Sequence, residues 1–258
     1  MERQRCLEVR GKVIGAGGRP LICTPLVGTG RREVLRELET ITAGNPDLIE
    51  WRADYFSGLA DSDAVLDLGA DIRRTAGNIP VIFTIRSGGE GGRPVNLSRD
   101  GVVGLYGRVC ESGHVDVIDF ELGNRPEHVG KLRNVSLRSG VRMIMSYHNF
   151  GETPDPGFLK AKAAAAESSG ADIVKIAVMP KDMGDVLTLL GVTLEESRRR
   201  NIPVITMSMG PLGALTRMAG WLFGSPVTFA VGEKSSAPGQ IPVADLRLVL
   251  DLLVRYGC

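Results

Sequence analysis

The sequence has 258 residues, with 31 Lys and Arg against 30 Asp and Glu, so the formal net charge is +1. A balance this close to zero argues against a nucleic-acid-binding protein, whose binding surface is normally rich in basic residues. Hydrophobic residues make up 43% and charged residues 24%, which is typical of a globular protein and excludes a disordered one. The length leaves open one large domain or two small ones.

The cysteines predict neither a metal site nor a disulfide framework. Cys6, Cys23, Cys110 and Cys258 lie far apart, without a CxxC pair or a histidine at ligand spacing. Residues 1–18 carry several charges, unlike a signal peptide, and no apolar run reaches the roughly 18 residues that a membrane-spanning helix needs. We therefore expect a cytoplasmic protein with reduced cysteines and no membrane partner.

Short apolar runs rich in Val and Ile recur along the chain, each bounded by turn or breaker residues. They are nearly continuous rather than alternating, which is typical of strands buried on both faces of a parallel sheet. There are eight of them, at Leu21–Val27, Leu48–Arg52, Val81–Arg86, Val115–Glu121, Val141–Tyr147, Asp172–Val178, Val204–Met209 and Val227–Val231.

Segments with helical spacing and composition separate these runs. Clear examples are Arg31–Ala43, Ser98–Glu111, Asp155–Ser169, Asp182–Arg200 and Val243–Tyr256. Eight βα units without a composition shift or linker favour an α/β fold in which residues 1–258 form a single (β/α)8 TIM barrel. Residues 1–20 are then an N-terminal extension, predicted to form a hairpin (Leu7–Arg10 and Lys12–Ile14) that caps the bottom of the barrel.

Polar residues gather at the carboxyl ends of the predicted strands, where the active site of such a barrel lies. Because side chains alternate across a strand, Glu50 and Arg52 share one face, whereas Trp51 faces the helices. Asp119 and Glu121 share a face in the same way, and we interpret this pair as support behind the site. The remaining polar strand-end residues include Arg86, His148, Asn149, Lys175, Ser208 and, further on, Arg217.

Lys175 interrupts the apolar run Asp172–Val178, so that its ammonium group is expected to have little water around it. Desolvation disfavours the charged form, and an uncharged amine is the form that attacks a carbonyl carbon. This placement predicts a lysine that forms a Schiff base. The alternative is a lysine that forms an internal salt bridge to Glu121 or to a neighbouring residue.

His148 ends the strand that precedes the Lys175 strand, so the two side chains are expected to be neighbours. A histidine can take up and return protons near neutral pH. Together the two residues predict an imine with a base beside it that removes a proton. The alternative is a core histidine that only forms hydrogen bonds, and for His114 and His128 we expect surface or capping roles.

The remaining candidate residues suggest an anionic or hydroxyl-rich substrate, because a guanidinium group matches a carboxylate with two hydrogen bonds. Glu50 is expected to accept a hydrogen bond from a hydroxyl group and Glu90 to orient His148, with interior ion pairing as the alternative for both. The glycine-rich stretch Ser87–Arg93 lacks the spacing of a phosphate-binding loop and is interpreted as a flexible loop beside the site. The stretch Gly232–Gln240 suits a loop that closes over substrate, with an ordinary surface loop as the alternative.

From Leu21 onwards the sequence resembles the type I 3-dehydroquinate dehydratases. The resemblance rests on EWRAD (50–54), FTIRS (83–87) with EGG (90–92), SYHNF (146–150), KIAVMP (175–180), DVLTLL (185–190), TMSMG (206–210) and SAPGQ (236–240). Each motif alone is weak, whereas all of them in order are specific. The sequence departs from the family pattern at Tyr147, Asn149 and Trp221.

The resemblance implies a barrel enzyme that needs no metal or cofactor and dehydrates 3-dehydroquinate to 3-dehydroshikimate in the shikimate pathway. It implies that Lys175 forms an imine with the substrate, that His148 acts as base and then acid, and that Glu90 orients His148. It also implies a homodimer and a set of substrate-binding residues. That set comprises Glu50, Arg52, Arg86, Arg217, Ser236 and Gln240, with Arg217 as the expected carboxylate partner.

Two rival functions remain at this point. A class I aldolase on the same barrel would also use a lysine imine, but one acting on sugar phosphates should have a phosphate-binding site after the seventh and eighth strands. The loops there contain Arg217 and Gln240, which suit a carboxylate and hydroxyl groups better. A noncatalytic metabolite-binding barrel would have no need of a strand-buried lysine beside a strand-end histidine.

Overall fold

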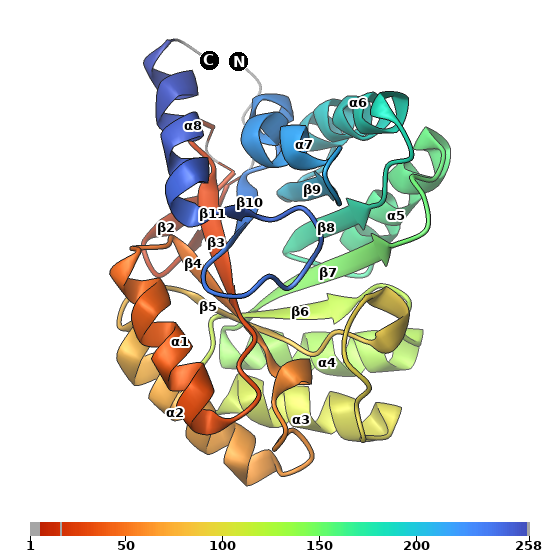
Figure 1. The fold of residues 1–258 in the computed structure, drawn as a ribbon. Helices are drawn as coiled ribbons and strands as arrows, with labels where there is room; N and C mark the ends of the chain where they lie inside the picture. The colour runs from red at the N-terminus through yellow and green to blue at the C-terminus, as the bar shows by residue number, and fades with distance from the viewer. Residues whose placement is uncertain (1–5, 16, 257–258) are drawn as a thin grey trace.

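A computed structural model describes residues 6–15 and 17–256 of the chain. Within these residues eight parallel strands alternate with eight helices, and the helices surround the strands (Figure 1). The barrel strands are β3 (Leu21–Leu26), β4 (Leu48–Arg52), β5 (Val81–Thr84), β6 (Val117–Glu121), β7 (Arg142–Asn149), β8 (Ile173–Val178), β9 (Val204–Ser208) and β10 (Val227–Val231). The predicted (β/α)8 barrel is confirmed, and each apolar run overlaps one of these strands.

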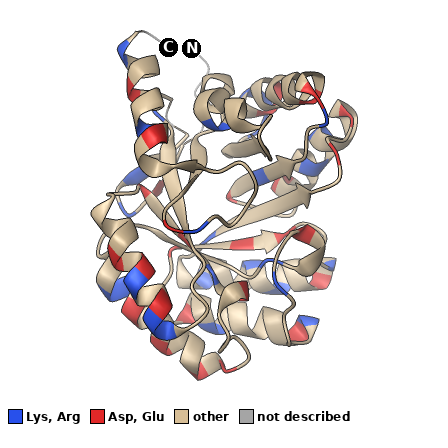
Figure 2. Cartoon of the chain, viewed as in Figure 1, with Lys and Arg blue, Asp and Glu red and all other residues tan. Residues whose placement is uncertain are grey.

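The helices follow the strands in order. They are α1 (Arg31–Ala43), α2 (Ser62–Ala76), α3 (Arg99–Glu111), α4 (Pro126–Ser139), α5 (Pro156–Ser168), α6 (Met183–Arg199), α7 (Ala214–Ala219) and α8 (Val243–Arg255). Charged residues of both signs lie along α1 and α2, as Figure 2 shows. None of the helices in the described part of the chain has the length and apolar character needed to cross a membrane.

The sheet has a seam between β9 and β10, for which no backbone pairing is found among the described residues. Strand β10 pairs with β3, and the pairing then follows chain order to β9. Ser225 bridges the two sides of the seam, because its Oγ accepts a hydrogen bond from the Thr206 N–H (3.0 Å) and donates one to the Thr206 carbonyl (3.3 Å). A short strand, β11 (Ile241–Pro242), pairs with the end of β10. Side chains therefore close the barrel where backbone ladders do not.

The inward-facing side chains form layers that change from apolar to charged along the barrel. The lowest layer is one apolar cluster that includes Leu48, Ile82, Val117, Ile144 and Ile173. Two residues further along each of these strands lies a buried polar side chain, and these are Glu50, Thr84, Asp119, Ser146 and Lys175. Another step of two, continuing just past the end of β5, reaches Arg52, Arg86, Glu121 and His148. The twofold alternation of strands thus concentrates charge at the carboxyl end of the barrel.

The outward-facing side chains of the same strands pack against the helices. Trp51, Phe83 and Phe120 lie in the outer core, as predicted for Trp51. With Tyr106 of α3 they form a row of edge-to-face rings, whose successive centroids are 5.2, 5.3 and 5.4 Å apart. The Tyr106 hydroxyl donates to the Asp119 carbonyl (2.7 Å) and accepts from the Ile85 N–H (2.8 Å). This row fixes β4, β5 and β6, which carry much of the charged layer.

The N-terminal strands β1 (Leu7–Val9) and β2 (Lys12–Ile14) form an antiparallel hairpin. Its turn uses positive φ angles at Arg10 (46°) and Gly11 (74°), the geometry of a tight two-residue hairpin loop. Val9 and Ile14 belong to the same apolar cluster as the lowest barrel layer. Residues 1–5 and 16 of the expected extension lie outside the described residues.

Candidate active site

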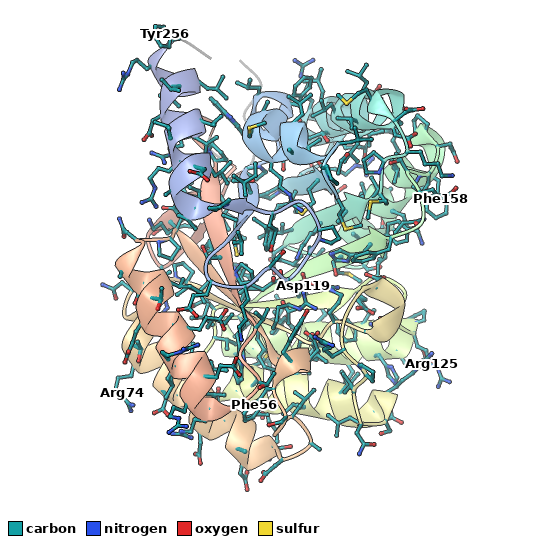
Figure 3. All side chains as sticks on the ribbon, in the orientation of Figure 1. Phe56, Arg74, Asp119, Arg125, Phe158 and Tyr256 are labelled. Carbon is teal, nitrogen blue, oxygen red and sulfur yellow. The ribbon has the colours of Figure 1, made fainter. Side chains whose placement is uncertain are left out.

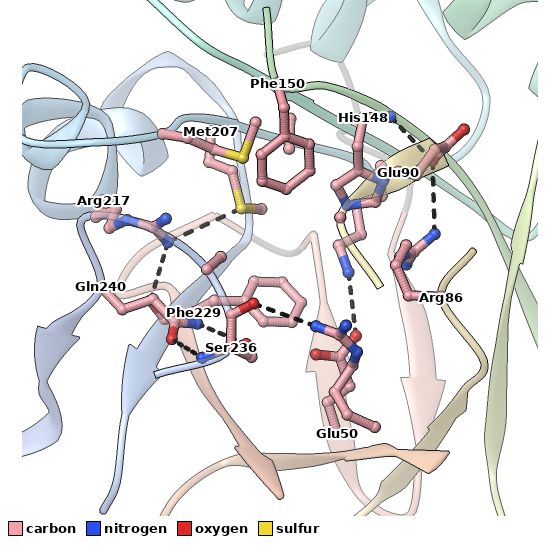
Figure 4. Close-up of a pocket in the computed structure, with 16 residues that line it drawn as sticks. Glu50, Arg86, Glu90, His148, Phe150, Met207, Arg217, Phe229, Ser236 and Gln240 are labelled. Carbon is pink, nitrogen blue, oxygen red and sulfur yellow. Dashed lines mark hydrogen bonds and ion pairs between the residues drawn. The ribbon is translucent and has the colours of Figure 1, made fainter. Parts of the chain in front are cut away.

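A pocket at the carboxyl ends of the strands collects all the site residues predicted from the sequence (Figure 4). These lining residues are Glu50, Arg52, Arg86, Glu90, His148, Lys175, Arg217, Ser236 and Gln240. They come from six barrel strands or the segments that follow them, separated by up to 190 positions in the chain (240 − 50). Apolar side chains complete the wall, among them Phe150, Met207 and Phe229, which the sequence did not distinguish from ordinary core.

Lys175 lies at the centre of the charged layer and is only 4% exposed. Its Nζ is 2.9 Å from Asp119 Oδ2 and 3.2 Å from Glu50 Oε1, and it lies 4.3 Å from the centroid of the Phe229 ring. The side chain thus has little contact with water, as expected, but two carboxylates lie beside it in addition to apolar groups. These contacts are of the kind that the salt-bridge alternative describes, with Asp119 and Glu50 as the partners, whereas Glu121 pairs with Arg86 (3.4 Å).

Asp119 contacts Lys175 directly, whereas the sequence suggested only a supporting position behind the site. It is fully buried near the centre of the molecule (Figure 3), where it contacts Lys175, the Ser146 hydroxyl (2.5 Å) and Arg86 Nη2 (2.8 Å). Burial disfavours its charged form, but Arg86 and Lys175 outweigh burial and hold the pKa of Asp119 well below its ordinary value. Asp119 is thus a permanently charged partner of the lysine.

His148 and Glu90 form a hydrogen-bonded pair beside Lys175. His148 Nδ1 is 2.8 Å from Glu90 Oε2, and the same oxygen accepts the His148 backbone N–H at 3.1 Å. Burial, together with the nearby cations Arg86 and Lys175, lowers the pKa of His148 well below its usual range. A neutral imidazole that donates from Nδ1 leaves the Nε2 lone pair free to accept a proton.

The pKa of Glu90 is shifted upward, in the opposite direction to that of His148. Burial and the nearby Glu121 carboxylate raise the pKa of Glu90 to about 8, despite the opposing effect of Arg86. Glu90 lies on the turn Gly88–Glu90 of the glycine-rich loop. A Cβ on Gly92 would come within 1.9 Å of the Arg86 carbonyl oxygen, so the neck of this loop requires glycine.

The arginines differ sharply in their partners. Arg52 binds Asp54 with two 2.8 Å hydrogen bonds, and although burial lowers its pKa these bonds more than compensate and raise it. The carboxylates around Arg86 likewise outweigh its burial and raise its pKa. Arg217, at 1% exposure, forms no ion pair within the described residues.

Arg217 reaches into the pocket from α7 through the barrel seam. It donates to the backbone carbonyls of Phe229 (3.2 Å) and Pro238 (3.1 Å), and burial alone lowers its pKa to about 10. At neutral pH it remains a cation, with neutral carbonyl groups as partners. An anionic ligand in the pocket would satisfy it.

The segment Gly232–Gln240 lies across the pocket mouth. Gln240 Oε1 accepts the Ser236 N–H (2.9 Å), and its Nε2 donates to Ser236 Oγ (3.2 Å). Arg52 Nη1 approaches the Ser236 carbonyl oxygen at 3.4 Å. The cavity left beneath the loop measures about 40 Å³, which is room for only a few water molecules.

The departures from the family pattern lie outside this chemistry. Tyr147 packs on Phe158 with its ring centroid 5.7 Å away, and Lys162 Nζ lies 4.9 Å from the Tyr147 centroid. Trp221 donates from Nε1 to the Met218 carbonyl (3.1 Å).

His128 is buried rather than on the surface, with Nε2 3.0 Å from Asp100 Oδ1. Among residues 6–15 and 17–256 there is no group of three or more His, Cys, Asp or Glu side chains placed to hold a metal ion.

We predict that the Glu90 carboxyl group titrates near pH 8, so that it carries a proton below that pH and loses it above. Carbon-13 NMR of the side-chain carboxyl groups measures this midpoint directly. Because Glu121 is one of the causes, Glu121→Gln should lower the midpoint, whereas Glu39→Gln on the exposed face of α1 should leave it unchanged. A Glu90 midpoint at its ordinary value near 4.5 in the unsubstituted protein would contradict the prediction.

Comparison with known sequences identifies a family for this arrangement. The sequence model of the type I 3-dehydroquinase family matches residues 22–256. The chain is 50% identical over 255 residues to the 3-dehydroquinate dehydratase of Aromatoleum aromaticum, a match that covers 99% of this chain and 98% of that protein. It is 51% identical over 253 residues to the enzyme of the same name from a Geobacillus species, covering 98% and 97% of the two chains.

Solved structures agree with the sequence relatives. The crystal structure of 3-dehydroquinate dehydratase from Geobacillus kaustophilus matches with a TM-score of 0.95 at 48% identity, over 98% of each chain. That of the type I enzyme from Clostridium difficile, with covalently modified comenic acid, matches with a TM-score of 0.93 at 36% identity, over 98% of each chain. The chain belongs to the type I 3-dehydroquinase family.

Proposed function

We propose that this chain dehydrates 3-dehydroquinate to 3-dehydroshikimate, a step of the shikimate pathway, through a Schiff base on Lys175. The observation that carries the proposal is the contact geometry of Lys175. Its amine lies between Glu50 and Asp119, with the His148 and Glu90 pair in the same pocket. A buried amine, a neutral imidazole and an arginine whose hydrogen-bond partners are uncharged together suit proton abstraction next to an imine on an anionic substrate.

Imine formation begins when Lys175 gives up a proton. Glu50 is the acceptor, because it contacts Nζ and has only the Thr84 hydroxyl (3.0 Å) as a further partner, whereas Asp119 is held ionised by Arg86. The free amine adds to the ketone carbon, and loss of water leaves an iminium ion. Asp119 then acts as the fixed counter-ion of that charge, which withdraws electrons from the neighbouring C–H bond.

His148 Nε2 removes the proton from the carbon next to the iminium, and the resulting electron pair is held as an enamine. The same imidazolium then protonates the β-hydroxyl as it leaves, which produces the conjugated double bond and a water molecule. Glu90 orients the imidazole through Nδ1 throughout. Hydrolysis of the imine releases the enone and restores Lys175.

Substrate binding is assigned to the charged rim. Arg217 binds the carboxylate, since among the described residues no carboxylate pairs with it. Arg52, Arg86, Ser236 and Gln240 bind or enclose the hydroxyl-bearing ring together with Glu50. The proposed chemistry assigns no step to a metal or an organic cofactor. An aldolase on this barrel remains the alternative, and it would produce no enone from 3-dehydroquinate.

We also propose that the chain acts as a single barrel capped by the β1–β2 hairpin, as a homodimer in the cytoplasm. The hairpin side chains Val9 and Ile14 share the apolar cluster of the barrel floor, which supports the first point. Exposed leucines on α8, Leu248 and Leu252, leave an apolar surface that a second copy would cover. Light scattering should give twice the 27.7 kDa chain mass, and a monomer at micromolar concentration would contradict the dimer.

The activity is tested by ultraviolet absorbance, because the conjugated enone product absorbs where 3-dehydroquinate does not. The unsubstituted chain should show enone formation, and Lys175→Met should abolish it. His148→Ala should lower kcat by about 10²- to 10⁴-fold, the usual contribution of a general base. Lys181→Met removes an exposed lysine and should leave turnover unchanged. Undiminished turnover in Lys175→Met or His148→Ala would contradict the assigned roles.

A further inference from the structure

Asp54 is a buried carboxylate that has no role in the chemistry above. It follows β4 in the short turn Ala53–Tyr55, and its side chain is fully buried. Its two oxygens accept four hydrogen bonds. Two come from Arg52 Nε and Nη2, both at 2.8 Å, and two come from the backbone N–H groups of Arg86 (3.3 Å) and Arg93 (3.1 Å).

The two backbone donors mark the ends of the loop that carries Glu90. Arg86 immediately precedes residues 87–92 and Arg93 immediately follows them, so one carboxylate draws both ends of the loop together. Inside the loop the Ser87 carbonyl accepts the N–H groups of Glu90 (3.0 Å) and Gly92 (2.8 Å). Charge-assisted bonds to a buried carboxylate are strong, so Asp54 fixes where the loop begins and ends.

The two side-chain donors to Asp54 both belong to Arg52. Arg52 lines the pocket, and its free Nη1 approaches the Ser236 carbonyl oxygen in the segment across the mouth. The planar guanidinium is held by both carboxylate oxygens, which leaves it little freedom to rotate. The position of Arg52 therefore depends on Asp54 as well.

We propose that Asp54 is a positioning residue that holds the substrate-binding Arg52 and the Glu90 loop in one fixed relation, and so links binding to proton transfer. This inference rests on the proposed function. Asp54 touches no reacting atom. It acts on binding through Arg52, and it acts on proton transfer through the Glu90 loop, whose tip holds the His148 imidazole.

A second aspartate, the partly buried Asp172, provides a control with a similar set of donors. Asp172 also accepts two hydrogen bonds from an arginine, Arg133 (2.6 and 3.1 Å), and one from a backbone N–H, that of Met143 (2.8 Å). It precedes β8 and therefore lies at the amino end of the barrel, away from the pocket. Asp172→Asn tests what the loss of such a carboxylate costs through stability alone.

The test is a double-mutant cycle in steady-state kinetics with 3-dehydroquinate. Arg52→Gln alone should raise KM and leave kcat nearly unchanged. Asp54→Asn alone should raise KM and lower kcat, each by about tenfold, because Arg52 and the ends of the Glu90 loop both lose a charged hydrogen-bond acceptor. In the Arg52→Gln background, Asp54→Asn should still lower kcat about tenfold without raising KM further. Asp172→Asn should keep both constants within about twofold, even with a lower Tm.

Three results would overturn the proposal. The first is a kcat for the double variant equal to that of Arg52→Gln, since Asp54 would then act only through Arg52. The second is wild-type kinetics for Asp54→Asn. The third is an equal loss of kcat in Asp172→Asn, which would reduce the effect to general destabilisation. Failure of the proposed function is distinct from all three, because the unsubstituted chain would then form no enone.

Discussion

The structure depends on the burial of the Lys175 ammonium group inside the barrel. A charge removed from water must be compensated by partners in contact, or the cost of burial is prohibitive. Here Asp119 and Glu50 supply that compensation at 2.9 and 3.2 Å. Asp119 in turn contacts Arg86, which binds Glu121 and approaches Glu90 (3.6 Å). One buried lysine is therefore linked to charges on β4, on β6 and in the segment after β5. The apolar layer beneath keeps water from reaching these groups from below.

This network of ion pairs also determines where a charged group of a ligand can bind. Within the described part of the chain, acidic side chains are matched to Lys175, Arg52 and Arg86, whereas Arg217 has neutral carbonyl groups as partners. The same surroundings separate the proton affinities of His148 and Glu90, since nearby cations oppose a proton on the histidine while burial and Glu121 favour one on the glutamate. A pocket that accepts an anion and holds a neutral base beside a lysine follows from one set of ion pairs.

The strands and the residues that face the pocket could be predicted from the sequence, because the spacing of apolar and polar residues along the chain indicates both. Continuous apolar runs located all eight strands, and the polar residue that interrupts a run, such as Lys175, marked the inner face two residues above the apolar floor. The mutual contacts could not be predicted in this way. Asp119 was assigned to the correct face, but alternation does not say which residue it meets on a strand 56 positions away.

Other omissions have the same physical cause. The four donors to Asp54 reach 39 positions along the chain and include backbone N–H groups, which leave no trace in composition or spacing. Phe229 and Met207 line the pocket, yet in sequence they are ordinary members of apolar strands. The neighbours of Lys175 in the chain are apolar, whereas its neighbours in space include two carboxylates, which the sequence alone does not identify.

The proposed mechanism requires a covalent bond at the Lys175 nitrogen atom, and borohydride trapping measures this bond directly. The protein is mixed with 3-dehydroquinate and sodium borohydride, digested, and the peptides are weighed by mass spectrometry. We expect loss of activity and the mass of the reduced ligand on the peptide that contains Lys175, with no such mass in Lys175→Met. The ligand mass on a different lysine, or on none while enone still forms, would contradict it.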